Sequence, residues 1–305
     1  MKTKKILYRS LGGAAFAGAV LLMASSVPAQ NLFVANASTD TIDEFTPGGV
    51  QSTFASGMNY PFGIAFNSAG DLFVANTANN AVPASGTITE IAPNGTQTTF
   101  ASGLDPIALA FNSTGDLFES DYRSGNIYEF TPGGAQTTFA TGFSFPISLA
   151  FNNAGNLFVG SGYGNGNGII TRITPGGVQG TFATGLSFPQ GLAFNSAGDL
   201  FVADSSSTSI LEYTPGGVQS TFASVNNPQG FAFNSAGDMF VSTVSGGIIE
   251  ITPGGTQSTF ATDAGLLEEL AFAPVPEPSV FALFGLGAAG MFTLCHRMRR
   301  KTISI

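Results

Sequence analysis

The sequence predicts an all-β fold, a six-bladed β-propeller with four antiparallel strands in each blade. Three observations predict it. One unit recurs six times, at spacings between 39 and 45 residues. Each unit holds four short strand-like runs separated by turns rich in Gly, Pro and Asn. The first copy lacks its first strand, and the end of the repeat region supplies one.

Composition agrees with this class. The chain has 305 residues, 43% of them hydrophobic and only 10% charged, with 40 Gly and 29 Phe. Few charges and many glycines argue against coiled coils and long helices. The apolar content argues against a disordered chain, which needs low hydrophobicity and high charge.

The four strands are clearest in the second copy. Ile64–Phe66 and Leu72–Ala75 are apolar runs without polar alternation, as expected for strands buried on both faces. Thr87–Ile91 and Gln97–Ala101 are the third and fourth strands. Residues 67–71, Asn-Ser-Ala-Gly-Asp, form the loop between the first two strands.

A Thr-Pro-Gly-Gly phrase joins the third and fourth strands, beginning with Thr46 in the first copy. Its last glycine is present in all six copies, which predicts a turn led by proline and closed by a glycine with positive φ.

The ends of the repeat region predict ring closure. The chain enters at Leu32, which begins a second strand, and the last phrase, Leu270-Ala271-Phe272, is a first strand. Pairing the two gives 24 strands with none left over and removes an open edge. An open solenoid would not need this match.

Residues 1–29 have the order of a secretory signal peptide. Lys2, Lys4, Lys5 and Arg9 precede an apolar segment from Leu11 to Met23 that is short for a bilayer span. We expect cleavage between Ala29 and Gln30 by signal peptidase. An uncleaved anchor is the alternative.

The other end, residues 274–305, has three parts. Pro276-Glu277-Pro278 is followed by an apolar run, Val280–Cys295, and a basic cluster, 296–301. This order resembles the PEP-CTERM sorting signal of Gram-negative bacteria. The resemblance implies transient inner-membrane anchoring by a transmembrane helix, processing by an exosortase, and delivery to the cell surface or extracellular matrix. A simple C-terminal anchor is the alternative.

The repeat unit also has a family likeness. Pro61-Phe62-Gly63-Ile64-Ala65-Phe66, followed by Gly70 to Asn76, resembles the NHL repeat, and residues 189–204 fit that pattern better. The resemblance spans residues 31–273, and residues 30–273 are the expected propeller domain. It implies a propeller fold, but such propellers include both binding modules and lactonase- or lyase-like enzymes.

Charge and residue content exclude several chemistries. Residues 31–273 hold 18 acidic residues against Arg123 and Arg172, a balance of −16 that repels phosphate backbones, so no nucleic-acid partner is expected. The sole cysteine and the sole histidine, Cys295 and His296, lie in the tail. Thiol catalysis and a Ser-His-Asp triad are therefore excluded from the body.

Two rings of residues are candidates for a site at the mouth of the channel, where blade-to-blade and second-to-third strand loops meet. The residues ending the second strands are Asn36, Asn76, Asp121, Ser161, Asp204 and Thr243. Those starting the first strands are Phe62, Ile107, Ile147, Gln190, Gln229 and Glu268. The oxygen donors that could hold Ca²⁺ or another divalent metal are Asn36, Asn76, Asp121, Asp204, Glu268 and Glu269. Gluconolactonase-like propellers hold such a metal, but no residue here matches their motif. We therefore expect no cofactor, with a channel metal as the alternative.

The second-to-third strand loops vary most in length, with long examples at residues 76–87 and 160–168. Glu119 replaces a valine of the repeat, and three explanations remain open: an ion pair with Arg123, a tolerated edge position or a perturbed acid. A recurrent glutamate three residues before the turn proline is explained by pairing across strands.

These residues favour a monomeric, exported module that binds a glycan, a protein or a matrix polymer, rather than an enzyme. A secreted, metal-dependent lactonase- or lyase-like hydrolase with its site at the channel is the alternative. A purely structural repeat protein is a third possibility. The lack of a body histidine weighs against the lyase version.

Overall fold

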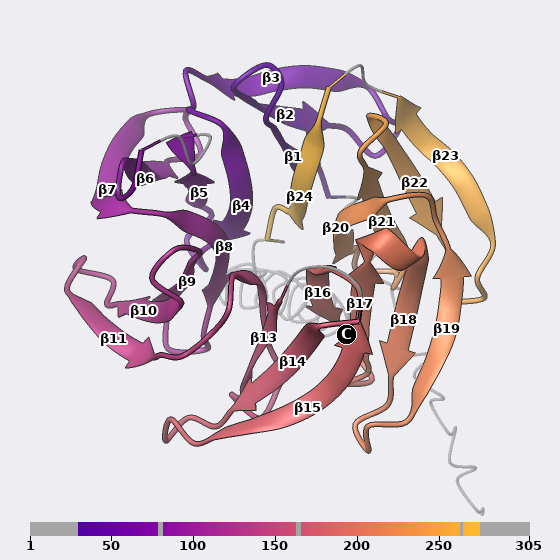
Figure 1. Cartoon of the computed structure of the whole chain (residues 1–305). Helices are drawn as coiled ribbons and strands as arrows, with labels where there is room; N and C mark the ends of the chain where they lie inside the picture. The colour runs from indigo at the N-terminus through magenta and orange to yellow at the C-terminus, as the bar shows by residue number, and fades with distance from the viewer. Residues whose placement is uncertain (1–29, 79–81, 163–165, 263–264, 275–305) are drawn as a thin grey trace, which may run out of the picture.

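A computed structural model describes residues 30–78, 82–162, 166–262 and 265–274. These residues form six four-stranded antiparallel sheets arranged as blades around a centre (Figure 1). The fold confirms the expected six-bladed propeller. The expected signal peptide, Ala29, and the sorting residues Pro276, Glu277 and Pro278 lie outside the described residues. Within the described ranges, no helix has the length and apolar character to cross a membrane.

In each blade the first strand lies nearest the centre of the propeller and the fourth lies at the outer edge. Blades are numbered in the order in which the chain reaches them. Blade one holds β24 (Leu267–Phe272), β1 (Leu32–Asn36), β2 (Thr41–Phe45) and β3 (Gln51–Ser56), and blade two holds β4 (Pro61–Phe66), β5 (Leu72–Asn76), β6 (Gly86–Ile91) and β7 (Gln97–Leu104). Blade three holds β8 (Pro106–Phe111), β9 (Leu117–Asp121), β10 (Asn126–Phe130) and β11 (Gln136–Ala140), and blade four holds β12 (Pro146–Phe151), β13 (Leu157–Ser161), β14 (Gly168–Ile173) and β15 (Gln179–Leu186). Blade five holds β16 (Pro189–Phe194), β17 (Leu200–Asp204), β18 (Ser209–Tyr213) and β19 (Gln219–Ser224), and blade six holds β20 (Pro228–Phe233), β21 (Met239–Thr243), β22 (Gly247–Ile251) and β23 (Gln257–Thr262).

The second strand of each blade is buried along its whole length, as its unbroken apolar sequence predicts. The fourth strand begins with three exposed polar residues and turns its phenylalanine inwards. The core therefore lies between blades, where sheets pack face to face.

Short-range hydrogen bonds define the two recurrent loops. Asn67 Oδ1 accepts hydrogen bonds from the backbone N–H groups of Ala69 and Asp71, and Asn67 Nδ2 donates to the Asp71 carboxylate. In the Thr-Pro-Gly-Gly turn, Gly49 N–H donates to the Thr46 carbonyl, and Gly49 has φ = +76°. The turn prediction is thereby confirmed.

Phenylalanines hold neighbouring blades together. Phe33 of β1 meets Phe54 of β3 and Phe66 of the next blade's β4 edge to face, with ring centroids 4.9 and 5.1 Å apart. The same three-ring arrangement recurs in every blade. In blade six, Phe240 makes the contact with Phe272 of β24, so the last interface is built like the others.

The ring is closed by pairing between the two ends of the repeat region. β24 lies antiparallel to β1, with Leu32 opposite Phe272 and Val34 opposite Leu270. Gln30 Nε2 donates to the Ala273 carbonyl at 2.6 Å. Closure is as predicted, and an open solenoid is excluded. All the strands and core clusters of the described residues lie within residues 30–274.

Candidate functional site

The inner strands place one of the two expected rings around the centre. Each first strand packs against the first strands of both neighbouring blades. The second residues of these strands are apolar on one half, Phe62, Ile107 and Ile147, and polar on the other, Gln190, Gln229 and Glu268. Gln190 Nε2 lies 3.4 Å from the Glu268 carboxylate, so the polar half-ring is joined across blade six.

Two adjacent carboxyl groups of β24 belong to this region. Burial raises the pKa of Glu268 to about 8. Burial, opposed by backbone hydrogen bonds from Leu270 and Phe231, also raises the pKa of Glu269 to about 8. The pKa of Tyr60 is raised by burial and by the charge of Glu268. At neutral pH both glutamates are therefore mainly protonated, so each can donate a proton.

The ring at the ends of the second strands has a structural role in three blades. Asp204 Oδ1 accepts hydrogen bonds from the N–H groups of Ser187 and Phe188, at 2.9 and 2.7 Å. Asp121 accepts in the same way from Asp105 N–H at 2.9 Å, and Asn76 from Asn59 N–H at 3.2 Å. Each of these side chains clamps the loop that enters its own blade. We call this contact the entry-loop clamp.

In blade one the equivalent residue, Asn36, donates to Asp43 at 3.0 Å and accepts from Ser38 N–H. Asn36, Asn76, Asp121 and Asp204 thus all make hydrogen bonds within their own blades. Within the described residues, no group of three or more His, Cys, Asp or Glu side chains is arranged to hold a metal ion.

Glu119 is the third strongly perturbed acid. It is fully buried in β9, and neither of its carboxylate oxygens has a hydrogen-bond partner. Burial, followed by the charges of Asp121 and Asp105, raises the pKa of Glu119 well above its usual range. The expected ion pair with Arg123 is wrong, because Arg123 lies 3.6 Å from Asp105 instead.

The recurrent glutamates are explained by strand pairing, as expected. The register pairs are Glu44 with Ser52, Glu90 with Thr98, Glu129 with Thr137, Glu212 with Ser220, and Glu250 with Ser258. In blade four Arg172 replaces the glutamate, and Gly180 stands opposite it.

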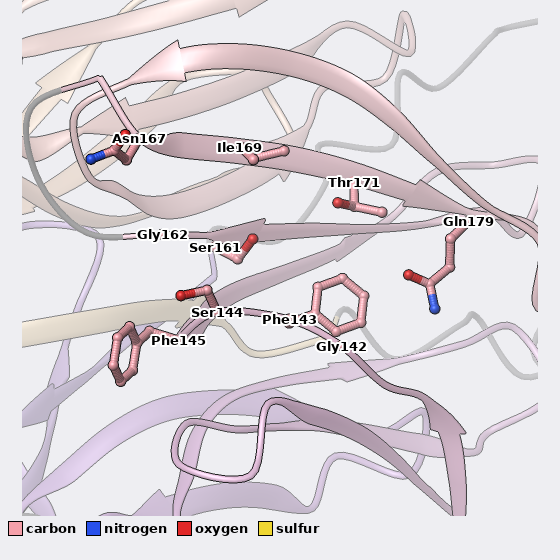
Figure 2. Close-up of a pocket in the computed structure, with 10 residues that line it drawn as sticks. All are labelled: Gly142, Phe143, Ser144, Phe145, Ser161, Gly162, Asn167, Ile169, Thr171 and Gln179. Carbon is pink, nitrogen blue, oxygen red and sulfur yellow. The ribbon is translucent and has the colours of Figure 1, made fainter.

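A cleft of about 420 Å³ opens between blades three and four (Figure 2). One wall is the entry loop of blade four, residues 142–145, and the other is formed by β14 and the end of β13 (Figure 2). It is lined by Gly142, Phe143, Ser144, Phe145, Ser161, Gly162, Asn167, Ile169, Thr171 and Gln179. Gly162 and Asn167 are the described ends of a long loop that the sequence marks as variable.

The cleft lies where the clamping side chain is short. Ser161 stands at the position of Asp204 and Asn76, and a serine is too short to bridge to the entry loop as those residues do. A similar cleft of about 380 Å³ lies between blades five and six, beside Thr243, the other short residue of the ring. In this second cleft Val225 stands in place of Phe143 and Asn226 in place of Ser144, and no aromatic residue is among the described lining residues.

Sequence reasoning did not single out the lining residues Phe145 and Ile169. Ile169 is 38% exposed and stands where the other blades have Thr41, Thr87, Asn126, Ser209 and Gly247. Phe145 is 45% exposed and stands where blades two, five and six have Tyr60, Phe188 and Asn227. A search of each repeat position for apolar residues at polar sites would have found Ile169 but not Phe145.

The chain has matches among protein-family models and among solved structures. Residues 274–300 match the model of the PEP-CTERM protein-sorting motif. This motif implies export, exosortase processing and membrane-anchored sorting in a Gram-negative bacterium. No curated protein matches the chain.

Solved propeller structures resemble the fold. A putative gluconolactonase shares 16% identity with a TM-score of 0.64, covering 79% of this chain and 94% of that one. Virginiamycin B lyase from Staphylococcus aureus shares 13% identity with a TM-score of 0.57, covering 77% and 85%. A streptogramin B lyase shares 14% identity with a TM-score of 0.59, covering 82% and 92%. At these identities the likeness shows the fold alone.

Proposed function

We propose that the mature protein is a binding module at the cell surface or in the extracellular matrix, contacting a glycan, a protein or a matrix polymer. The observation that carries this proposal is the open cleft between blades three and four. Its lining includes an exposed aromatic ring on a rigid scaffold, the arrangement typical of recognition surfaces.

The address signal supports the same role. A PEP-CTERM motif delivers its protein beyond the inner membrane, where the partners available are surface proteins and secreted polymers. The acidic body, at −16 over residues 31–273, favours uncharged or cationic partners over anionic ones.

The test is retention on the producing cell's own matrix. Matrix material would be separated into polysaccharide and protein fractions and immobilised, and residues 30–274 passed over each in a biosensor. We expect saturable retention on at least one fraction. Retention no greater than that of an unrelated globular protein of similar pI, on both fractions, would overturn the proposal.

A second candidate is a metal-dependent, lactonase-like hydrolase. The observation that favours it is the polar half-ring of Glu268, Gln190 and Gln229, together with the pKa of about 8 at Glu268 and Glu269. Glu268 would exchange a proton with a substrate oxygen. A lyase version is disfavoured, because a histidine-to-alanine variant of virginiamycin B lyase is catalytically inactive and the body of this chain has no histidine.

Metal content and hydrolysis test this candidate together. Residues 30–274 would be analysed by inductively coupled plasma mass spectrometry before and after chelation, and assayed on a panel of lactones and esters. One divalent ion per chain, with hydrolysis lost on chelation and in Glu268→Gln, would support it. Metal-free protein without hydrolytic activity, even after Ca²⁺ or Mg²⁺ is added, would contradict it.

A further inference from the structure

We propose that the cleft between blades three and four binds a segment of an uncharged polysaccharide, with the sugar rings packed against Phe145. This inference rests on the proposed binding function and names the ligand class of that site. It is carried by three properties of the cleft: where apolar residues are exposed, how Phe145 is held, and which polar groups surround it.

Two of the seven large exposed hydrophobics among the described residues lie in the cleft: Phe145, the aromatic member of that group, and Ile169. Three others, Val50, Val178 and Val218, follow the Gly-Gly turns of the repeat, and Val82 and Val244 lie in other loops. Ile169 departs from the small and polar residues of its repeat position, so the cleft combines an unusual apolar residue with an exposed aromatic ring.

The backbone holds the Phe145 ring at a cost. Phe145 has φ = +52°, a region that bulky residues rarely occupy. Asn227, at the equivalent position of blade six, has φ = +45°, and Tyr60, at that position in blade two, has φ = +55°. Phe188 stands there in blade five. The position is therefore aromatic in three blades, and Phe145 is the member of that set whose side chain counts among the large exposed hydrophobics.

The Phe145 ring also packs against a second aromatic ring. Tyr122 of blade three lies against Phe145 with ring centroids 4.9 Å apart and an interplanar angle of 36°. Two aromatic rings packed in this way limit the freedom of the Phe145 side chain, so little entropy is lost when a ligand packs on it.

The polar lining identifies the ligand class. Ser144, Ser161, Thr171, Asn167 and Gln179 supply hydroxyl and amide groups, which both donate and accept hydrogen bonds (Figure 2). A sugar ring presents the matching pair of surfaces: C–H groups on its faces, which pack on an aromatic ring, and hydroxyl groups around its rim.

None of the described residues that line the cleft carries a charge. An anionic polymer would find no cation there and would be repelled by the acidic body, and a cationic ligand would find no carboxylate. The volume of about 420 Å³ lies within the range of about 300–1,000 Å³ usual for ligand sites. These facts favour a neutral sugar polymer over a charged polymer.

The experiment is affinity gel electrophoresis of residues 30–274. Gels would contain one of four neutral polymers, dextran, mixed-linkage β-glucan, galactomannan or xyloglucan, or alginate as the anionic probe. We expect retardation by at least one neutral polymer and none by alginate. Retardation by alginate alone, or by no neutral polymer, would overturn the inference.

Two variants connect binding to the cleft without removing the fold. Phe145→Asn installs the residue that blade six uses at a similar positive φ, and we expect binding about tenfold weaker. Ser161→Asn installs the side chain that clamps the entry loop in blade two, and narrowing the cleft is expected to weaken binding similarly. Phe145→Tyr keeps an aromatic ring at this position, so its affinity is expected to stay close to that of the original protein.

The matched control is Asn226→Ala in the second cleft, which has no aromatic residue in its lining. It is expected to bind like the original protein. Unchanged binding in Phe145→Asn would contradict the inference even if a polymer binds. Failure of all neutral polymers with retention on a matrix protein fraction would reject the sugar ligand and leave the binding function standing; no retention anywhere would reject both.

Discussion

At the scale of single residues, this chain is most informative where it departs from its own repeat. Glu119 replaces a valine, and Glu269 stands where the other inner strands have Gly63, Ala108, Ser148, Gly191 and Gly230. Glu269 fits because Gly230 leaves space: a Cβ there would lie 2.8 Å from the Glu269 Cα. Glu119 has no such accommodation and stays buried without a hydrogen bond. It is therefore a cost to stability.

Replacing Glu119 by valine is expected to stabilise the protein by about 1–3 kcal/mol at pH 7, because it removes an unsatisfied buried carboxyl and restores the repeat residue. Glu119→Gln keeps the shape and a polar group, so it should gain less. Urea denaturation followed by fluorescence would measure both. Lower stability in Glu119→Val than in the original protein would contradict this account.

The pH dependence of stability follows from the same acids. The folded pKa values of Glu119, Glu268 and Glu269 all lie above the usual value of 4.5, so the folded state binds more protons. Stability is therefore expected to be highest near pH 4.5 and to fall as pH rises towards 8. Thermal melts between pH 4.5 and 8.5 would show a falling Tm, with a smaller slope in Glu119→Val. A Tm that rises across this range would refute the assignment.

At the scale of elements, the inner strands limit which residues the blades can use. A Cβ added at Gly63 would lie 2.3 Å from the Ile107 carbonyl oxygen and 2.9 Å from the Ala108 Cα. Both are backbone atoms, which cannot turn aside as a side chain can. Close approach of β4 and β8 is thus what requires glycine here, and the central ring is tightly packed.

Gly63→Ala is accordingly expected to lower the free energy of unfolding by about 1–3 kcal/mol, since the inner strands must separate to admit one methyl group. The matched control is Gly180→Ala in β15, where a Cβ would meet nothing within 4 Å and φ is not positive. This control should change stability by less than about 0.5 kcal/mol. Equal effects of the two substitutions, measured by urea titration, would show that close approach is not the cause.

At the scale of the whole molecule, one strand decides whether the ring exists. β24 completes the sheet of blade one and supplies Phe272 to the interface with blade six. Without it, β1, which is buried along its whole length, would become an exposed edge.

Truncation at Leu266 is therefore expected to abolish the compact monomer. Size-exclusion chromatography should show aggregated or oligomeric protein, and the cooperative thermal transition should be lost. A chain ending at Pro274 keeps β24 and is the control, expected to elute as a monomer. A monomeric, cooperatively folding chain that ends at Leu266 would mean that closure is not needed.

Much of the fold could be predicted from the sequence, because its determinants are local and occur six times. Apolar runs predict the strand positions, and the loop residues equivalent to Asn67 and Gly49 predict the turns. Because each pattern occurs in six copies, an assignment made in one copy can be checked in the other five. The closing match between Leu32 and Phe272 follows from counting strands. The site was less predictable: Asn76, Asp121 and Asp204 look like candidate ligands in the sequence, yet their hydrogen bonds hold entry loops.

The sequence by itself determined the propeller, its closure, the sorting motif and the absence of histidine and cysteine from the body. Only the tertiary structure decided which polar residues are structural, that Glu119 lacks its expected partner, and that Ser161 leaves a cleft beside Phe145. The physical reason is that periodicity records what all six copies share, within blades and between them. Clamps, buried acids and the cleft arise where single copies depart from the repeat, and their contacts depend on side-chain positions that only the folded chain sets.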